Sequence, residues 1–344
     1  MRDAAWGPPW SRPLRGRWVC DTVRSDALVG NPLGDPAARP LYVWLPPGYD
    51  DDPTRRWPVV VFLHGFAGQA DAWANRRAFQ PTLLERIDAA APTAIVALPD
   101  GWTSWGGAQW LDSPAVGAYQ TYLSLDVVAH LDRTYRTTPD RAARAVAGHS
   151  SGGYGAVLSA LHHPEVWGRW ASHAGDGLFE ACFLPDLRVV TRTLQQRYRG
   201  SWDAFWAEVA ERGPLSRDDD FPLLNTWAMA ACFAEGRLPC DAAGRLDLEA
   251  WAAWLACDPV RMVADPAWCG AVRSWLGVWI DAGTRDDVYL DLAATALNDA
   301  LLAAGLPGQR VMFALHDGRH GGQEHRFPAS IAWLAGQMAG GATS

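Results

Sequence analysis

Extended, apolar-rich runs recur along this 344-residue chain, and helix-like segments separate them from the third run onward. The runs lie at 18–23, 41–45, 59–63, 94–98, 144–147, 169–172, 278–281 and 310–315. The helix-like segments include 81–90, 122–135, 152–163 and 290–304. This alternation predicts an α/β fold with a mostly parallel sheet and helices on both faces, and the first two runs predict an antiparallel edge. Functional residues of such sheets lie just beyond the carboxyl ends of the strands.

One region departs from this alternation. Residues 177–275 contain no clear strand, and their helix-like segments (187–198, 201–212 and 248–257) are separated by Pro, Gly and Asp clusters. A connecting loop of this length is uncommon in a compact domain. The sequence therefore predicts an α/β core formed by 1–176 and 276–344, with a Trp-rich helical insertion, or cap, over the sheet.

Composition and charge exclude several functional classes. The net charge of −8 argues against a nucleic-acid partner. No apolar run approaches the length of a membrane span, and the N-terminal residues lack the apolar core of a signal peptide, so we expect a cytoplasmic protein unless a signal was trimmed. None of the six cysteines forms a CxxC pair or lies at zinc-site spacing with histidine, so we expect no metal and no organic cofactor.

The most informative motif is Gly-His-Ser-Ser-Gly-Gly at residues 148–153, between an apolar run and a helix-like segment. A Gly-x-Ser-x-Gly sequence that joins a strand to a helix is typical of a nucleophile elbow. Gly148 and Gly152 leave room for the tight turn, and the turn exposes the hydroxyl of Ser150 beside a helix N-terminus that favours negative charge. The alternative is a glycine-rich turn with an incidental serine.

A serine nucleophile needs an adjacent base, and in elbow-type enzymes that base is a histidine late in the chain. Of the nine histidines, His316, His320 and His325 follow the last predicted strand. His320 lies in a glycine-flanked loop that can bring its imidazole over Ser150, so we predict His320 as the base. His316 and His325 are the alternatives.

The acid that orients the histidine should follow the preceding strand. Asp286 lies three residues after Gly283 in that position, and we predict it as the acid. Asp287 is the nearest alternative, and either aspartate can instead cap the helix that follows. Asp176, after the run at 169–172, is a further alternative.

An oxyanion hole requires backbone N–H donors beside the nucleophile. We predict one from Ser151, the residue after the nucleophile. The second is predicted from Phe66, which follows His64-Gly65 at the end of the third run. The alternative for His64-Gly65 is a tight exit from the strand.

Together these motifs resemble the putative esterase (esterase D-like, enterochelin esterase-like) family of α/β-hydrolases. The matching segments are 42–49, 57–65, 98–101, 148–155 and 283–286, and the likeness covers about 17–175 and 276–335. The eight runs predict an eight-stranded sheet, and the resemblance implies an α/β-hydrolase fold with a triad of Ser150, Asp286 and His320. It implies nothing for the insertion, which is longer than the family usually carries there.

The chemistry predicted from these residues is hydrolysis of a carboxylic ester through an acyl-enzyme. An acyltransferase or thioesterase would use the same triad, and a non-catalytic binding protein on this fold is a third alternative. The chain contains 20 tryptophans, of which Trp105 and Trp110 lie in a glycine-rich loop after the fourth run. We expect both to bind substrate, a small-molecule ester with an aromatic acyl or sugar group. The insertion can act as a lid or as a dimer interface, so a homo-oligomer stays open.

Overall fold

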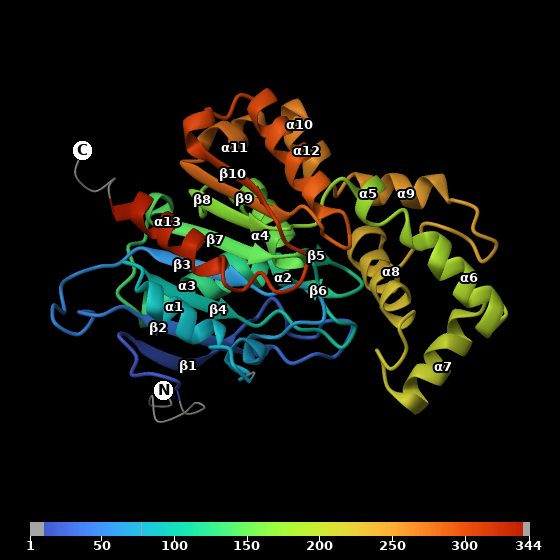
Figure 1. Ribbon diagram of the computed structural model, residues 1–344, viewed down its shortest axis with the longest axis horizontal. Coiled ribbons are helices and arrows are strands. Elements are labelled where there is room, and N and C mark those ends of the chain that lie inside the picture. The colour runs from blue at the N-terminus through green and yellow to red at the C-terminus, as the bar shows by residue number, and fades with distance from the viewer. Residues whose placement is uncertain (1–9, 77, 340–344) are drawn as a thin grey trace.

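The computed structural model describes residues 10–76 and 78–339, which form one eight-stranded sheet with the order β1-β2-β4-β3-β7-β8-β9-β10 (Figure 1). The strands are β1 (Arg17–Arg24), β2 (Ala38–Leu45), β3 (Val59–Leu63), β4 (Ile95–Pro99), β7 (Arg144–His149), β8 (Arg169–His173), β9 (Gly277–Gly283) and β10 (Val311–His316). β1, β2 and β4 pair antiparallel, and the pairs from β4 to β10 are parallel. The predicted fold class is therefore confirmed. A separate two-stranded hairpin, β5 (Asp112–Ser113) and β6 (Gly117–Ala118), was not predicted.

The central strands are apolar on both faces because helices cover both faces. Every residue of β3, with the sequence Val-Val-Val-Phe-Leu, is buried. The helices of the core are α1 (Leu83–Ala90), α2 (Tyr119–Thr121), α3 (Val128–Thr134), α4 (Ser151–His162), α12 (Leu290–Ala303) and α13 (Phe327–Ala339). A π-helical turn, η2 (Tyr122–Val127), joins α2 to α3. α1 and α13 pack together on one face, whereas α4 and α12 cover β7, β8 and β9 on the other.

Seven α-helices lie between β8 and β9, and a short 3-10 helix, η4 (Pro266–Trp268), precedes the last of them. The α-helices are α5 (Phe179–Cys182), α6 (Asp186–Tyr198), α7 (Trp202–Arg212), α8 (Asp220–Ala234), α9 (Leu248–Leu255), α10 (Pro259–Ala264) and α11 (Cys269–Ser274). Figure 1 shows α6 to α9 as a lobe beside the sheet, whereas α10 and α11 lie with α12. The segment 177–275 therefore has two parts: a projecting lobe, and a crossover that packs on the core helices α4 and α12.

A single buried carboxylate joins the two ends of this lobe. Asp258 accepts hydrogen bonds from the backbone N–H groups of Leu178 (3.1 Å) and Phe179 (2.9 Å), where the chain enters the lobe. The same side chain accepts from the N–H of Val260 (2.9 Å) and so caps α10, where the chain returns. Asp258 is fully buried, so the entry and exit of the lobe are fixed to each other.

No helix within residues 10–76 and 78–339 combines the length and the apolarity that crossing a bilayer requires.

Candidate active site

The turn from β7 into α4 places Ser150 in a strained backbone conformation, with φ 58° and ψ −127°. The neighbouring glycines are needed for close approach of the backbone. A Cβ on Gly148 would lie 2.4 Å from the carbonyl carbon of Gly152, and a Cβ on Gly152 would lie 2.3 Å from the carbonyl oxygen of Leu63. Strain of this kind persists only where the surrounding structure holds it, and it is concentrated at functional sites.

Ser150, His320 and Asp286 form one continuous chain of hydrogen bonds. The Ser150 Oγ lies 3.0 Å from His320 Nε2, and His320 Nδ1 lies 2.9 Å from Asp286 Oδ2. With a neutral imidazole, the serine hydroxyl donates to Nε2 and the Nδ1–H donates to the carboxylate. The structure thus brings together three residues that the sequence analysis selected from loops after β7, β9 and β10.

The charges in this chain favour an ionised acid and a basic imidazole. Burial raises the pKa of the Asp286 carboxyl, but the hydrogen bond and charge of His320 and the N–H of Val288 outweigh burial and leave this pKa below 3.8. Burial lowers the pKa of His320, but the hydrogen bond and charge of Asp286 outweigh it and leave this pKa above 6.5. Ionised Asp286 can therefore stabilise an imidazolium at His320.

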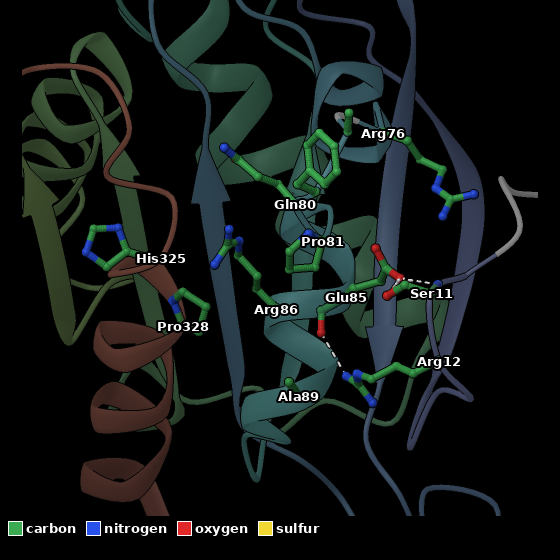
Figure 2. A pocket seen from close by; sticks show the side chains of 12 residues that line it. Ser11, Arg12, Arg76, Gln80, Pro81, Glu85, Arg86, Ala89, His325 and Pro328 are labelled. Carbon is green, nitrogen blue, oxygen red and sulfur yellow. Dashed lines mark hydrogen bonds between the residues drawn. The ribbon is translucent and has the colours of Figure 1, made fainter.

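The alternative histidines lie elsewhere. His325 lines a broad surface groove of about 900 Å³ with Arg86 and Pro328, and its Nδ1 lies 3.1 Å from the carbonyl oxygen of Gly322. Figure 2 shows this groove between the start of α13, α1 and the segment that carries Arg12. The ring of His316 lies against Gly318, at the end of β10.

The alternative acids also differ from Asp286 in their surroundings. The side chain of Asp287 is 58% exposed and lies 3.5 Å from the guanidinium of Arg319. Asp176 is buried and accepts hydrogen bonds from Gln109 Nε2 (3.0 Å) and Ser151 Oγ (3.3 Å). Burial raises the pKa of Asp176, so this carboxyl is less acidic than Asp286.

The predicted oxyanion donors come from two different segments that adjoin the nucleophile. Ser151 is the first residue of α4, so its N–H belongs to the helix N-terminus. The loop after β3 lies against Ser150, because a Cβ on Gly65 would be 3.0 Å from the Ser150 Cβ. Among the hydrogen bonds of the described residues, none uses the backbone N–H of Phe66 or Ser151. Both groups are therefore available as donors.

His149, which precedes the nucleophile, is a residue that the sequence analysis did not single out. Its ring centroid lies 4.8 Å from that of His320 and 5.4 Å from that of Phe327. Its Nε2–H donates to the carbonyl oxygen of His320 (3.1 Å). Burial lowers the pKa of His149 to about 3, so the ring is neutral and supports the His320 loop without adding charge. Its position beside the nucleophile was the only signal for it in the sequence.

A second buried pair lies beneath the elbow. His173 Nδ1 donates to Asp281 Oδ1 (2.6 Å), and His173 Nε2 contacts the hydroxyl of Ser330 (2.7 Å). The N–H of Ser150 donates to the backbone carbonyl of His173 (2.9 Å). This network joins β8, β9 and α13 directly under the nucleophile, so it can hold the strand ends that carry the candidate triad.

The two predicted substrate-binding tryptophans have different environments. Trp105 lines a cavity beside Phe66. Trp110 is only 3% exposed, and its indole N–H donates to the carbonyl oxygen of His64 (3.1 Å). The indole occupies space left by Gly155, where a Cβ would lie 2.6 Å from the Trp110 Cβ. The structure therefore places Trp110 in the core, as packing for the loop after β3, and not in the cavity wall.

In the part of the chain that the structure describes, no three His, Cys, Asp or Glu side chains are grouped as a metal site would require.

Comparison with known proteins gives a family and a fold. The family model described as "Putative esterase" matches residues 36–336. An uncharacterized protein of Corynebacterium glutamicum is 32% identical over 177 residues, which are 49% of this chain and 39% of that protein. An esterase of Mycobacterium tuberculosis is 30% identical over 126 residues, which are 35% of this chain and 26% of that protein. The matches thus span less than half the length of these curated relatives.

Two solved structures have the same fold at low sequence identity. A ferulic acid esterase matches with a TM-score of 0.59 and 18% identity, covering 95% of this chain and all of that chain (100%). An S-formylglutathione hydrolase from Agrobacterium tumefaciens matches with a TM-score of 0.58 and 17% identity, covering 96% of this chain and 98% of that chain. These likenesses support the α/β-hydrolase fold.

Proposed function

The chain belongs to the putative esterase family, and from this we propose that it is a serine-dependent carboxylic ester hydrolase. The observation that carries the proposal is the hydrogen-bonded chain from Asp286 through His320 to Ser150, which ends at a strained elbow beside free N–H donors. The family membership favours ester hydrolysis among the reactions open to such a triad.

The proposed reaction begins at the Ser150 hydroxyl. Its oxygen attacks the ester carbonyl carbon while His320 Nε2 takes the hydroxyl proton. Asp286 holds the Nδ1–H tautomer and stabilises the imidazolium that forms. The negative oxygen of the tetrahedral intermediate accepts hydrogen bonds from the N–H groups of Phe66 and Ser151.

Collapse of this intermediate breaks the ester C–O bond and leaves an acyl group on Ser150. His320 gives its proton to the departing alkoxide, which leaves as the alcohol. Water then enters, loses a proton to His320 and attacks the acyl-enzyme. The second tetrahedral intermediate collapses to the carboxylic acid, and His320 gives the proton taken from water to the departing Ser150 oxygen, which restores the hydroxyl.

The test compares two adjacent serines. Hydrolysis of p-nitrophenyl acetate is measured for the wild type, Ser150→Ala and Ser151→Ala. Ser151→Ala keeps the backbone N–H and removes only the hydroxyl that contacts Asp176, so it controls for a general effect at the elbow.

We expect Ser150→Ala to lose about 10⁴-fold or more in kcat and Ser151→Ala to change activity by less than about 10-fold. Wild-type activity that survives Ser150→Ala would contradict the proposal. Electrospray mass spectrometry of the wild type during turnover should show the mass of one acetyl group, and Ser150→Ala should lack it.

A further inference from the structure

An aromatic cavity of about 520 Å³ lies between the core and the projecting lobe. Its walls come from the loop after β3, the loop after β4, the helix α7 with the turn after it, and α8. The residues that carry the argument are Phe66, Thr103, Trp105, Trp206, Ala210 and Leu215. An apolar cavity of about 150 Å³ accommodates benzene, so this one has room for a ring with substituents or for a chain.

The cavity adjoins the proposed oxyanion hole through one residue. The side chain of Phe66 lines the cavity, whereas its backbone N–H is a proposed oxyanion donor. Gly65, the preceding residue, lies against Ser150. Neither Ser150 nor His320 lines the cavity. An ester carbonyl at Ser150 would therefore lie outside it, with one substituent of the ester reaching in past Phe66.

The position of His320 indicates which substituent this is. The leaving alcohol must receive its proton from His320 Nε2, so it departs on the His320 side of Ser150. The cavity lies on the Phe66 side, and no residue of the loop that carries His320 lines it. The group that enters the cavity is therefore the acyl group.

Aromatic contacts hold the core wall and the lobe wall of the cavity together. The ring centroids of Trp105 and Trp227 are 6.0 Å apart, and those of Trp206 and Trp227 are 5.5 Å apart. Phe66 meets Phe221 of α8 with a centroid separation of 5.7 Å. Edge-to-face pairs at these distances are favourable, so the cavity is already formed before a ligand enters.

Two polar atoms in this apolar lining have no partner within the described residues. Thr103 is fully buried, yet its Oγ1 makes no hydrogen bond. The Nε1–H of Trp206 is buried and also makes none. Both atoms are closed off from the open space of the cavity, so the surface that the cavity offers to a ligand is mostly apolar.

We propose that this cavity binds the acyl group of the substrate, and that this group is an apolar ring or chain. The inference rests on the proposed function, because it assigns the acyl side of that reaction. It also assigns part of the specificity to the lobe, since Trp206 and Ala210 belong to α7.

The first experiment fills the cavity from an exposed position. Ala210 lines the cavity and is exposed on α7, so Ala210→Trp places an indole in the cavity without replacing a core residue. Ala207 is exposed on the same helix and does not line the cavity, so Ala207→Trp is the matched control. The substrates are p-nitrophenyl acetate and p-nitrophenyl 3-(4-hydroxyphenyl)propanoate, which share a leaving group.

We expect Ala210→Trp to lower kcat/KM for the aryl ester at least about 10-fold more than for the acetate, because acetyl does not reach the cavity. Ala207→Trp should behave as the wild type with both. Equal effects of Ala210→Trp on the two esters, or no effect on either, would overturn the inference.

A binding measurement separates this inference from the proposed function. Calorimetric titration of 3-(4-hydroxyphenyl)propanoate into Ser150→Ala protein requires no catalysis. Binding that is lost when Ala210→Trp is combined with Ser150→Ala supports the cavity assignment. If the wild type hydrolyses no ester, that result refutes the proposed function and leaves the cavity assignment in place. Ester hydrolysis with no binding of the acid, or with binding that Ala210→Trp does not weaken, refutes the cavity assignment alone.

Discussion

Replacing Asp286 by asparagine removes a charge with almost no change in shape. The variant Asp286→Asn keeps an oxygen that can accept from the N–H of Val288, a contact of 2.9 Å in the structure. It loses the carboxylate that lies 2.9 Å from His320 Nδ1. The perturbation therefore tests the electrostatic role proposed for Asp286 more than its role in folding.

The expected loss follows from that distance. Two unit charges 2.9 Å apart attract by about 6 kcal/mol at an effective dielectric constant of about 20. Since about 1.4 kcal/mol of barrier corresponds to a tenfold change in rate, removing this attraction from the transition state should lower kcat/KM by about 10⁴-fold. Loss of the acid in Ser-His-Asp enzymes has an effect of the same order.

The pH dependence should change as well. His320 must be neutral to accept the serine proton, so wild-type activity falls as the pH drops through the pKa of His320, which lies above 6.5. In Asp286→Asn the hydrogen bond and charge that raise this pKa are lost, whereas burial, which lowers it, stays. The residual activity should therefore persist to lower pH than that of the wild type.

The assay is kcat/KM for p-nitrophenyl acetate against pH, followed at the isosbestic wavelength of p-nitrophenol. Asp287→Asn is the matched control. Asp287 is the next residue, but its side chain is 58% exposed and its ion pair with Arg319, at 3.5 Å, lies at the surface. We expect the control to lose less than about 3-fold. The reasoning would be refuted if Asp286→Asn kept more than a hundredth of wild-type activity, or if its acidic limb moved to higher pH.

Three further outcomes are expected. His149→Phe keeps an aromatic ring beside His320 but loses the hydrogen bond to the carbonyl oxygen of His320. We therefore expect kcat for p-nitrophenyl acetate to fall about 10-fold, with KM and Tm unchanged. An unchanged kcat would contradict a role of His149 in positioning His320. Burial raises the pKa of Asp281, but the charge and hydrogen bond of His173, the hydrogen bond of Trp279 and the charge of Arg326 outweigh burial and hold this pKa at about 2. This stabilisation is present above pH 3.8 and is lost as the pH falls towards 2. Asp281→Asn should therefore lower the free energy of unfolding, measured by urea titration, by about 2 kcal/mol at pH 7 and by less at pH 3. The cysteines between 232 and 269 are free thiols, so dithiothreitol should leave Tm unchanged, and a fall would reveal a disulfide.

Local patterns were sufficient for the fold and for bringing the candidate triad together. Short apolar runs separated by helix-like segments predicted each strand of the large sheet, and Gly148 and Gly152 predicted the elbow. Chain order then placed Ser150, Asp286 and His320 at neighbouring strand ends, because parallel strands end at the same edge. Their catalytic roles stay predictions that the variants above test.

Features that depend on distant contacts were not predictable. Trp110 was expected in a pocket because glycines flank it, but Gly155, on another element, makes the space that buries it. The helix α8 has an apolar sequence on nearly all sides, so it lacks the periodicity that marks a helix with one buried face. The division of 177–275 at Asp258 depends on backbone partners at Leu178 and Phe179.

The hydrogen bonds of Asp258 hold the two ends of the lobe together, so the lobe is a segment that can be exchanged as one unit, here called the cassette. Its two ends meet at one carboxylate, so the distance that a replacement must span is that of a short turn, and loop closure of this kind costs little. The sheet, the elbow and the crossover helices lie outside the cassette, whereas α7 and α8, which wall the acyl cavity, lie inside it. Exchange of the cassette between homologues would then change which acids are accepted while leaving the chemical steps to the same core.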